Sequence, residues 1–353
     1  IPFRESFRHS SFNRKETETI LSIVNTKNNS GYGEGCPREY VTNESIKSSL
    51  FFLEKNRSDW NKLINIESII DWLDRNRSIV DRNPAAFCSF ELAFLDLLGH
   101  ENKKSTESIV GLNELNGNFG YTAVLGILNQ EKFISQVQRY SKIGFSDFKV
   151  KLSGNLNLDS ENISHLNKTI SNSRIRLDAN NLWKDWRSAA DYIAKLDFQF
   201  LGVEEPLAHG DYDGMQKFFG VTNTPVILDE SFLRFEHFKY IQSSPDNWLI
   251  NLRISKMGGI LRSVEIAKQA EKLGLHLIIG AQVGETSILS RAALLIANHY
   301  RDIVIAQEGA FGTYLLEKDI TEHPIVFGKD GILESSSINT DGYGWGITFN
   351  TLQ

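Results

Sequence analysis

The order of hydrophobic and polar residues changes character about a third of the way along the chain. Before that point, residues 19–24 (TILSIV) have the composition of a strand, and residues 45–53 and 85–98 carry apolar side chains at helical spacing. We expect Gly99 to end the second helix and the glycines of residues 31–35 to form a tight turn. The first part of the chain is therefore predicted to be an α+β domain.

After about residue 115, short apolar strands alternate with amphipathic helices. The expected strands lie near residues 121–126, 147–151, 174–178, 200–204, 226–229, 248–253, 276–280 and 302–306. The expected helices between them include residues 131–142, 161–171, 188–195, 261–273 and 286–297. Eight strands that start at intervals of about 25 residues predict an α/β fold, a (β/α)₈ barrel of the TIM type.

These patterns divide the chain into three parts. We expect residues 1–115 to form the α+β domain, residues 116–315 the barrel, and residues 316–353 a tail that leaves the barrel. We expect this tail, which carries TDGYGWGITF near its end, to pack back on the α+β domain and complete it.

Composition and charge exclude several classes of protein. With 41% hydrophobic and 23% charged residues over 353 positions, the chain has the material for a large core, which excludes a disordered protein. The net charge of −6 and the scattered basic residues argue against a nucleic-acid partner. No apolar run reaches the length of a membrane span, and Cys36 and Cys88 lack the spacing of a disulfide framework, which favours a reducing cytoplasm.

Charged residues end five consecutive predicted strands of the barrel. They are Lys149 and Lys151 on the second strand, Asp178 on the third, Glu204 on the fourth, Asp229 on the fifth and Arg253 on the sixth. In a closed barrel these equivalent positions surround one mouth, the face that carries the active site in such folds. A single strand-end acid is usually a helix cap, and a Lys-x-Lys pair is usually a solvated strand face, but five strand ends in register favour a functional ring.

The residue types of this ring suggest a chemistry. Three carboxylates held close together repel one another unless a cation lies between them. A hard divalent ion such as Mg²⁺ meets that need and keeps open positions for an anionic substrate. Lys149 and Lys151 are two residues apart on a strand, so both side chains point into the barrel, where a lysine beside a metal and a second cation can serve as a base.

The motifs FKVKLSG, RLDANNLW, GVEEPL, ILDES and INLRISKMGG resemble those of the enolase superfamily, and more narrowly of its muconate lactonizing enzyme subgroup, over nearly the whole chain. The segments GYGEG and CSFELAFLDLLG resemble its N-terminal capping domain. The resemblance implies that Asp178, Glu204 and Asp229 hold one Mg²⁺, with Mn²⁺ as a substitute. It implies that Lys151 is the acid/base catalyst, with Lys149 as its electrostatic neighbour, and it favours a homo-oligomer.

Two positions depart from the subgroup's pattern. The second catalytic lysine of its Asn-x-Lys motif is replaced by Arg253, which stays protonated and is a poor base, although it can stabilise an enolate. Lys256 is the only nearby lysine that can replace it, and which of the two acts stays open. On the eighth strand, an Asp-x-Asp motif of dipeptide epimerases is replaced around Glu308, which argues against a dipeptide, although Glu308 alone can bind an ammonium group.

Other polar residues are expected to line the substrate. Gln282 and Glu285 follow the seventh strand, and Arg8 and Arg38 lie in segments that the resemblance places over the barrel mouth, where they can bind a second anionic group. For each arginine, a role as a solvated loop residue stays open.

The function that follows is abstraction by Lys151 of the proton next to a substrate carboxylate, through an enediolate and with Mg²⁺ as cofactor. The enzyme is expected to be an isomerase, of the cycloisomerase, racemase or epimerase type, or a lyase, acting on a small carboxylate. The alternative is a family member that keeps the metal site, lacks turnover and serves as a binding or structural protein. The substrate and the choice among these reactions stay open.

Overall fold

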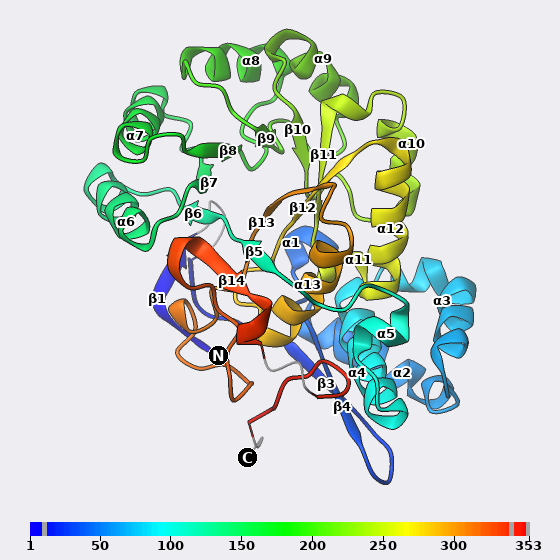
Figure 1. The fold of residues 1–353 in the computed structure, drawn as a ribbon. Helices are drawn as coiled ribbons and strands as arrows, with labels where there is room; N and C mark the ends of the chain where they lie inside the picture. Colours follow the sequence, from blue (N-terminus) through cyan, green and yellow to red (C-terminus); the bar gives the residue numbers. More distant parts are fainter. Residues whose placement is uncertain (9–12, 339–341, 351–353) are drawn as a thin grey trace.

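The computed structural model describes residues 1–8, 13–338 and 342–350, and it contains one parallel sheet of eight strands (Figure 1). The strands are β6 (Ala123–Leu125), β7 (Asp147–Lys151), β8 (Arg174–Asp178), β9 (Gly202–Glu204), β10 (Val226–Leu228), β11 (Trp248–Leu252), β12 (His276–Ile279) and β13 (Val304–Gln307). Each strand pairs with its neighbours in sequence, in the order β6 to β13. Between the two outermost strands, the backbone N–H of Thr122 donates to the carbonyl of Gln307 at 2.8 Å. The predicted (β/α)₈ architecture is confirmed.

Helices follow the strands on the outside of the sheet. They are α6 (Gln130–Ile143), α7 (Leu156–Thr169), α8 (Trp186–Lys195), α9 (Tyr212–Thr222), α10 (Phe238–Ile241), α11 (Ile254–Met257), α12 (Ile260–Leu273) and α13 (Ser287–His299). Short 3₁₀ turns at η1 (Phe235–His237) and η2 (Pro245–Asn247) flank α10. Within the described ranges, none of the helices combines the length and the apolar composition that crossing a membrane requires.

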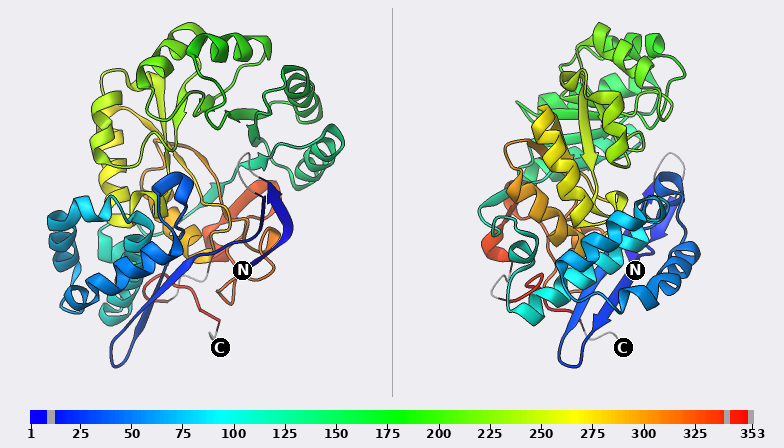
Figure 2. Two further views of the ribbon diagram at one scale, coloured as in Figure 1. Left: turned by 180° about the vertical axis from the view of Figure 1, so that it is seen from behind. Right: turned by 90° about the vertical axis from the view of Figure 1, so that its right-hand side faces the viewer.

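The N-terminal part contains two hairpins and five helices. They are β1 (Pro2–Arg8), β2 (Asn13–Glu16), β3 (Ile20–Asn25), β4 (Ser30–Gly35), α1 (Glu39–Thr42), α2 (Ile46–Trp60), α3 (Ile66–Val80), α4 (Pro84–Asn102) and α5 (Thr106–Val110). The β3–β4 hairpin and the helices α2 to α4 lie at the opposite end of the molecule from α8 and α9 (Figure 2). The later segments add β5 (Asn118–Gly120), η3 (Gly312–Tyr314), η4 (Lys329–Gly331), β14 (Ile332–Glu334), which pairs with β5, and η5 (Ser335–Ser337).

The glycines of residues 31–35 form strand β4, so the predicted tight turn there is wrong. The hairpin turns at residues 26–29 instead, before the strand begins. A Cβ atom on Gly33 would lie 2.2 Å from the carbonyl oxygen of Ser89, because this face of β4 packs directly on the backbone of α4. The glycines therefore serve close packing between two backbones, a need that the local sequence does not distinguish from a turn.

Helix α4 continues past Gly99 to Asn102, so the predicted helix end at Gly99 is wrong, and Lys103 takes the left-handed conformation that ends the helix. A Cβ atom on Gly99 would lie 2.4 Å from the Cα of Gly344, so this glycine admits the C-terminal segment. In that segment, the N–H of Trp345 donates to Asp96 of α4 at 2.8 Å. The domain limits at residues 115 and 315 stay a prediction.

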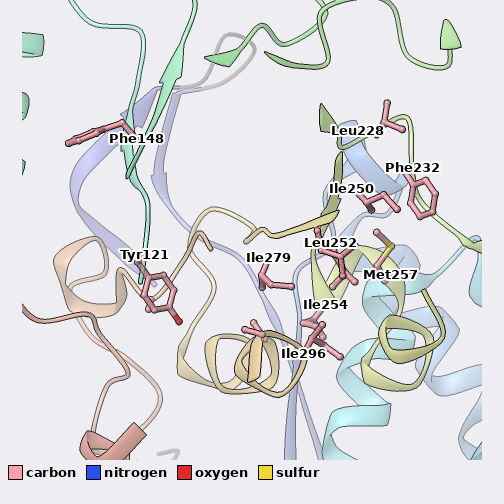
Figure 3. Packing of buried hydrophobic residues seen from close by; sticks show 14 of the residues in the cluster. Tyr121, Phe148, Leu228, Phe232, Ile250, Leu252, Ile254, Met257, Ile279 and Ile296 are labelled. Atoms are coloured by element: carbon pink, nitrogen blue, oxygen red, sulfur yellow. The ribbon is translucent and has the colours of Figure 1, made fainter. Parts of the chain in front are cut away.

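The barrel has an outer and an inner apolar layer. Figure 3 shows part of the outer layer, where Leu228, Ile250 and Leu252 from β10 and β11 lie near Phe232 and Met257 from the segments that follow these strands. The inner layer is a separate buried cluster. It consists of Ile227, Leu249, Ile278 and Ala306.

The inner layer places the charged strand ends. Side chains two residues apart on a strand point to the same face. Asp229 follows Ile227 by two residues, Glu308 follows Ala306 by two, and Arg253 follows Leu249 by four. These charged groups therefore lie above an apolar floor, at the carboxyl-terminal mouth of the barrel.

Candidate active site at the barrel mouth

Three of the predicted site residues form one row across the sheet. In the strand register, Asp178 on β8 pairs with Lys151 on β7 and with Glu204 on β9. All three side chains are buried at the end of their strands. Paired residues of parallel strands point to the same face, so the row places the lysine beside two of the three predicted metal ligands.

Lys149 lies between three carboxylates. Its Nζ is 2.9 Å from Glu204 Oε1, 3.4 Å from Asp178 Oδ2 and 3.5 Å from Glu308 Oε2. Burial opposes the charged form, but these carboxylates outweigh it and raise the pKa of Lys149 above its ordinary value. Lys149 is therefore a fixed positive charge of the site.

Lys151 has fewer acceptors than Lys149. Its Nζ donates to Asp178 Oδ2 and to Asn180 Oδ1, both at 2.8 Å. The two bonds aim the amine at the row of carboxylates and use two of its three protons.

Glu204 is the central carboxylate of the site. Burial and the negative charges of Asp178 and Asp229 raise the pKa of Glu204 to about 7, although Lys149 opposes the shift. The shift expresses the mutual repulsion that a cation between the three carboxylates would relieve.

Asp229 is held by two cations from the sixth βα unit. Its Oδ1 accepts from Lys256 Nζ at 2.9 Å, and its Oδ2 contacts Arg253 Nη2. Burial favours the neutral acid, but Arg253 and Lys256 outweigh it and lower the pKa of Asp229. Asp229 is therefore a carboxylate in this arrangement.

Lys256 is fully buried beneath Asp229. Its Nζ also donates to the carbonyl oxygens of Asp229 and Asn251, each at 2.7 Å, so all its protons have acceptors. Burial lowers the pKa of Lys256 despite the nearby Asp229. This geometry fits a lysine that holds the β10 and β11 ends together, and its role as the second base stays an untested prediction.

Arg253 bridges two of the predicted metal ligands. Besides contacting Asp229, its Nη2 lies 3.7 Å from Glu204 Oε1, and its Nη1 donates to Gln282 Oε1 at 3.2 Å. Burial alone would lower the pKa of Arg253, but Asp229 and Glu204 raise it. The residue is therefore a permanent cation at this position.

The donor set of the site fits a hard divalent cation. Asp178, Glu204 and Asp229 offer carboxylate oxygens, the ligands that Mg²⁺ prefers. Among the described residues, Glu204 Oε2 is a buried oxygen whose partner is a cation, Lys149 Nζ at 2.8 Å. In the same part of the chain, no three acidic, thiol or imidazole groups stand close enough to hold an ion as placed, since lysine and arginine side chains lie against the carboxylates.

The eighth strand brings Glu308 to the mouth beside two cations. Its Oε1 lies 3.2 Å from Nη2 of Arg176, and its Oε2 lies 3.5 Å from Lys149. Arg176 is fully buried and also bonds to Thr122 and Asp147. The charge of Glu308 is therefore already neutralised inside the barrel.

The loop after β12 presents Gln282 to Arg253. Glu285 Oε1 accepts from the backbone N–H of Gln282 at 2.6 Å and shapes this loop. Desolvation raises the pKa of Glu285 to about 8, and the bond from Gln282 opposes the shift. The two predicted substrate-lining residues thus lie together, and Gln282 contacts Arg253 directly.

The two arginines predicted to bind a second anion differ in what the structure describes. Arg38 is buried, and it donates to the carbonyls of Glu18 at 3.0 Å, Pro37 at 2.8 Å and Val283 at 2.9 Å. It therefore ties the N-terminal part to the loop of Gln282 instead of facing an open space. Arg8 ends β1, and its side chain lies outside the described residues.

Several residues that order the site were missed from the sequence. Glu205 accepts from the N–H groups of Asp229 and Ser231, at 2.8 and 2.7 Å, and so fixes the loop after β10. Asn251 donates to Glu204 at 3.3 Å, and Asn180 accepts from Lys151. The doubled acid of GVEEPL and the spacing of Asn251 two residues before Arg253 were the available signals.

Comparisons with known proteins agree with this architecture. The sequence model of the enolase C-terminal domain-like family matches residues 132–352. An N-succinyl-L-Arg/Lys racemase of Bacillus cereus is 26% identical over 326 residues, which cover 91% of this chain and 86% of the relative.

Two solved structures share the fold over nearly the whole chain. A substrate-liganded L-Ala-D/L-Glu epimerase of Bacillus subtilis superimposes with a TM-score of 0.86 at 21% identity, covering 100% of this chain and 97% of the other. A dipeptide epimerase of Enterococcus faecalis, complexed with Mg and the dipeptide L-Leu-L-Tyr, superimposes with a TM-score of 0.83 at 22% identity. The match covers 99% of this chain and 96% of the other.

Proposed function

The chain belongs to the enolase superfamily, and from that premise we propose that it is a Mg²⁺-dependent isomerase of racemase or epimerase type that acts on a small carboxylate. The observation that carries the proposal is the row of Lys151, Asp178 and Glu204 at the barrel mouth, with Asp229 beside it. Asp178, Glu204 and Asp229 would hold the ion. When bound, Mg²⁺ supplies positive charge that acidifies the carbon next to a carboxylate.

Each cationic residue has a distinct role in this proposal. Lys151, aimed by Asn180, takes the proton from the carbon next to the substrate carboxylate and returns it. Lys149 keeps its proton and stabilises negative charge that develops on the substrate. Arg253 lies across the carboxylates, where it supplies charge but accepts no proton.

The surroundings of Glu308 favour a substrate without a free ammonium group. Glu308 is neutralised by Arg176 and Lys149, so it has no surplus charge to attract a second cation. We therefore propose an amino acid derivative whose nitrogen is acylated, as the name of the racemase relative indicates for that protein. The dipeptide named for the second solved structure is the competing class.

The site offers Lys151 as a base on one face of the substrate, and this affects the stereochemical outcome. Lys151 serves one face of the substrate, whereas Arg253 accepts no proton and Lys256 is enclosed. Return of the proton by Lys151 retains the configuration, and inversion requires a proton delivered to the opposite face. We therefore expect exchange of the substrate proton with solvent to be faster than inversion of configuration.

The test is deuterium uptake from D₂O, followed by mass spectrometry over N-acyl amino acids and dipeptides, with Mg²⁺ and with EDTA. We expect Mg²⁺-dependent uptake by the wild type and a loss of at least about 10³-fold in Lys151→Ala, the scale of a general base. Lys142→Ala, an exposed lysine on α6, is the matched control. Uptake by Lys151→Ala at the wild-type rate would contradict the proposal. Ligand binding without uptake in the wild type would favour the alternative of a protein without turnover.

A further inference from the structure

Arg253 stands where the carboxylates would receive a metal. Its Nη2 contacts Asp229 Oδ2 and lies 3.7 Å from Glu204 Oε1. Its Nη1 is tethered to Gln282 Oε1 at 3.2 Å. One guanidinium group therefore spans two of the three candidate ligands from a fixed anchor.

A divalent ion and this guanidinium group cannot both contact the same oxygen of Asp229. Mg²⁺ binds oxygen at about 2.0–2.1 Å in a strict octahedral geometry. A guanidinium nitrogen in contact with the same oxygen would then lie within a few ångströms of the ion, where two positive charges repel strongly in a buried site. The ion enters only when Nη2 leaves Asp229.

The neighbourhood offers Arg253 another place. Gln282 already holds its second nitrogen, and Glu285 of the same loop accepts from the backbone N–H of Gln282. The guanidinium can turn about its anchor toward this loop and remain paired. Arg253 thus has two sets of partners. In contact with Asp229 and Glu204 it blocks the metal site, and in contact with the loop of Gln282 alone it leaves the site open.

We propose that Arg253 is a tethered cation that competes with the divalent metal for Asp229 and Glu204, so that its position sets the metal affinity of the site. The inference rests on the proposed metal site. It assigns to Arg253 an effect that occurs before any substrate is present. Metal binding displaces the guanidinium from Asp229, and in the metal-free protein the guanidinium balances the negative charge of Asp229 and Glu204. The same three carboxylates, with an uncharged residue in place of Arg253, would bind metal more tightly.

The test is titration of the metal-free full-length protein with Mn²⁺ alone, followed by electron paramagnetic resonance of the free ion. We expect Arg253→Met, which keeps the length and removes the charge, to bind Mn²⁺ at least about tenfold more tightly than the wild type. We expect Arg253→Lys to fall between the two. Arg139→Met, an exposed arginine on α6, is the control for loss of one positive charge and should match the wild type.

Asp229→Asn, alone and combined with Arg253→Met, shows whether the measured binding occurs at the triad, and circular dichroism shows that each variant is folded. Equal or weaker Mn²⁺ affinity in both Arg253 variants, with binding still lost in Asp229→Asn, would overturn the inference and leave the proposed metal site standing. No binding that depends on Asp229 in any background would overturn both.

Discussion

Two groups of buried carboxylates in this molecule have opposite kinds of partner. At the barrel mouth, Asp178, Glu204 and Asp229 are paired with lysine and arginine side chains. At the junction between α4 and the barrel, Glu91 accepts from the backbone N–H groups of Ile260 and Leu261, the first residues of α12. Both groups consist of buried acidic side chains, but those at the mouth contact charged side chains and those at the junction contact backbone N–H groups.

The junction contains further examples. Glu34 of β4 accepts from the N–H groups of Thr286 at 3.1 Å and Leu289 at 3.3 Å, at the start of α13. Asp96 accepts from Tyr32 and Trp345 at 2.9 and 2.8 Å, and so joins three distant segments. Carboxylates that satisfy the free N–H groups of helix starts act as caps.

The difference separates chemistry from assembly. A backbone N–H cannot move away from its acceptor without unfolding the helix end, whereas a lysine or arginine side chain can turn to another partner. The mouth carboxylates are therefore free to exchange one cation for another, as metal binding requires. The junction carboxylates hold the barrel and the N-terminal part in place.

The largest expected effect comes from removing one charge at the mouth. Glu204→Gln should lower Mg²⁺-dependent deuterium exchange by at least about 10³-fold, because a metal ligand is lost. Its free energy of unfolding should change by less than about 1 kcal/mol, since the substitution also relieves repulsion from Asp178 and Asp229. Glu161→Gln, exposed on α7, is the control. Unchanged exchange together with a large loss in urea-unfolding free energy would place Glu204 with the junction group.

The second effect concerns the packing of the junction. Gly33→Ala should lower the free energy of unfolding by at least about 3 kcal/mol, because its Cβ would lie 2.2 Å from a backbone oxygen that cannot yield. Gly220→Ala, inside α9 with no atom near the added Cβ, is the matched control and should stabilise by about 0.5–1 kcal/mol. Equal urea-unfolding free energies for the two variants would contradict close packing of β4 on α4.

The smallest effect is the titration of a junction carboxylate. Glu91→Gln should cost about 1–2 kcal/mol near pH 5, since the amide has one oxygen for two N–H groups that each contact a different oxygen of Glu91. Burial raises the pKa of Glu91 to about 8, against the two backbone hydrogen bonds. A raised pKa means that folding favours the protonated acid, so its stabilisation falls as the pH rises from about 4.5 through 8.

Unfolding in urea at pH 5, 7 and 9 measures this effect. The advantage of the wild type over Glu91→Gln should shrink with rising pH. An advantage that grows with pH would show that the ionised carboxylate is the form that caps α12.

The sequence predicts the mouth far better than the junction. Strand ends are local features, so the positions of Asp178, Glu204 and Arg253 follow from strand periodicity alone, and all eight strands lie at the expected places. The role of Gly33 against Ser89 depends on a contact between segments far apart in the chain, which no local pattern reports. Arg38 was predicted to line the substrate, which stays a prediction, but its bond to the carbonyl of Val283 was not foreseen, for the same reason.

The ion pairs that the charged residues of the mouth form also could not be predicted from the sequence. The ring predicts a metal between carboxylates, but it does not predict that Arg253 contacts Asp229 or that Arg176 neutralises Glu308. The first contact joins the ends of the consecutive strands β10 and β11, and the second joins β8 to the end of β13. Both depend on how far the side chains reach across the mouth. Motif spacing places the residues, and only the fold shows their pairing.

The most direct test of the difference between mouth and junction is a crystal structure of the protein grown with Mn²⁺, with anomalous diffraction to locate the ion. We predict one peak between Asp178, Glu204 and Asp229, with the Arg253 guanidinium withdrawn from Asp229 while Glu91 and Glu34 keep their backbone hydrogen bonds. The absence of a peak between these three carboxylates, or a peak there with Arg253 still in contact with Asp229, would contradict the claim that the mouth carboxylates exchange Arg253 for a metal ion.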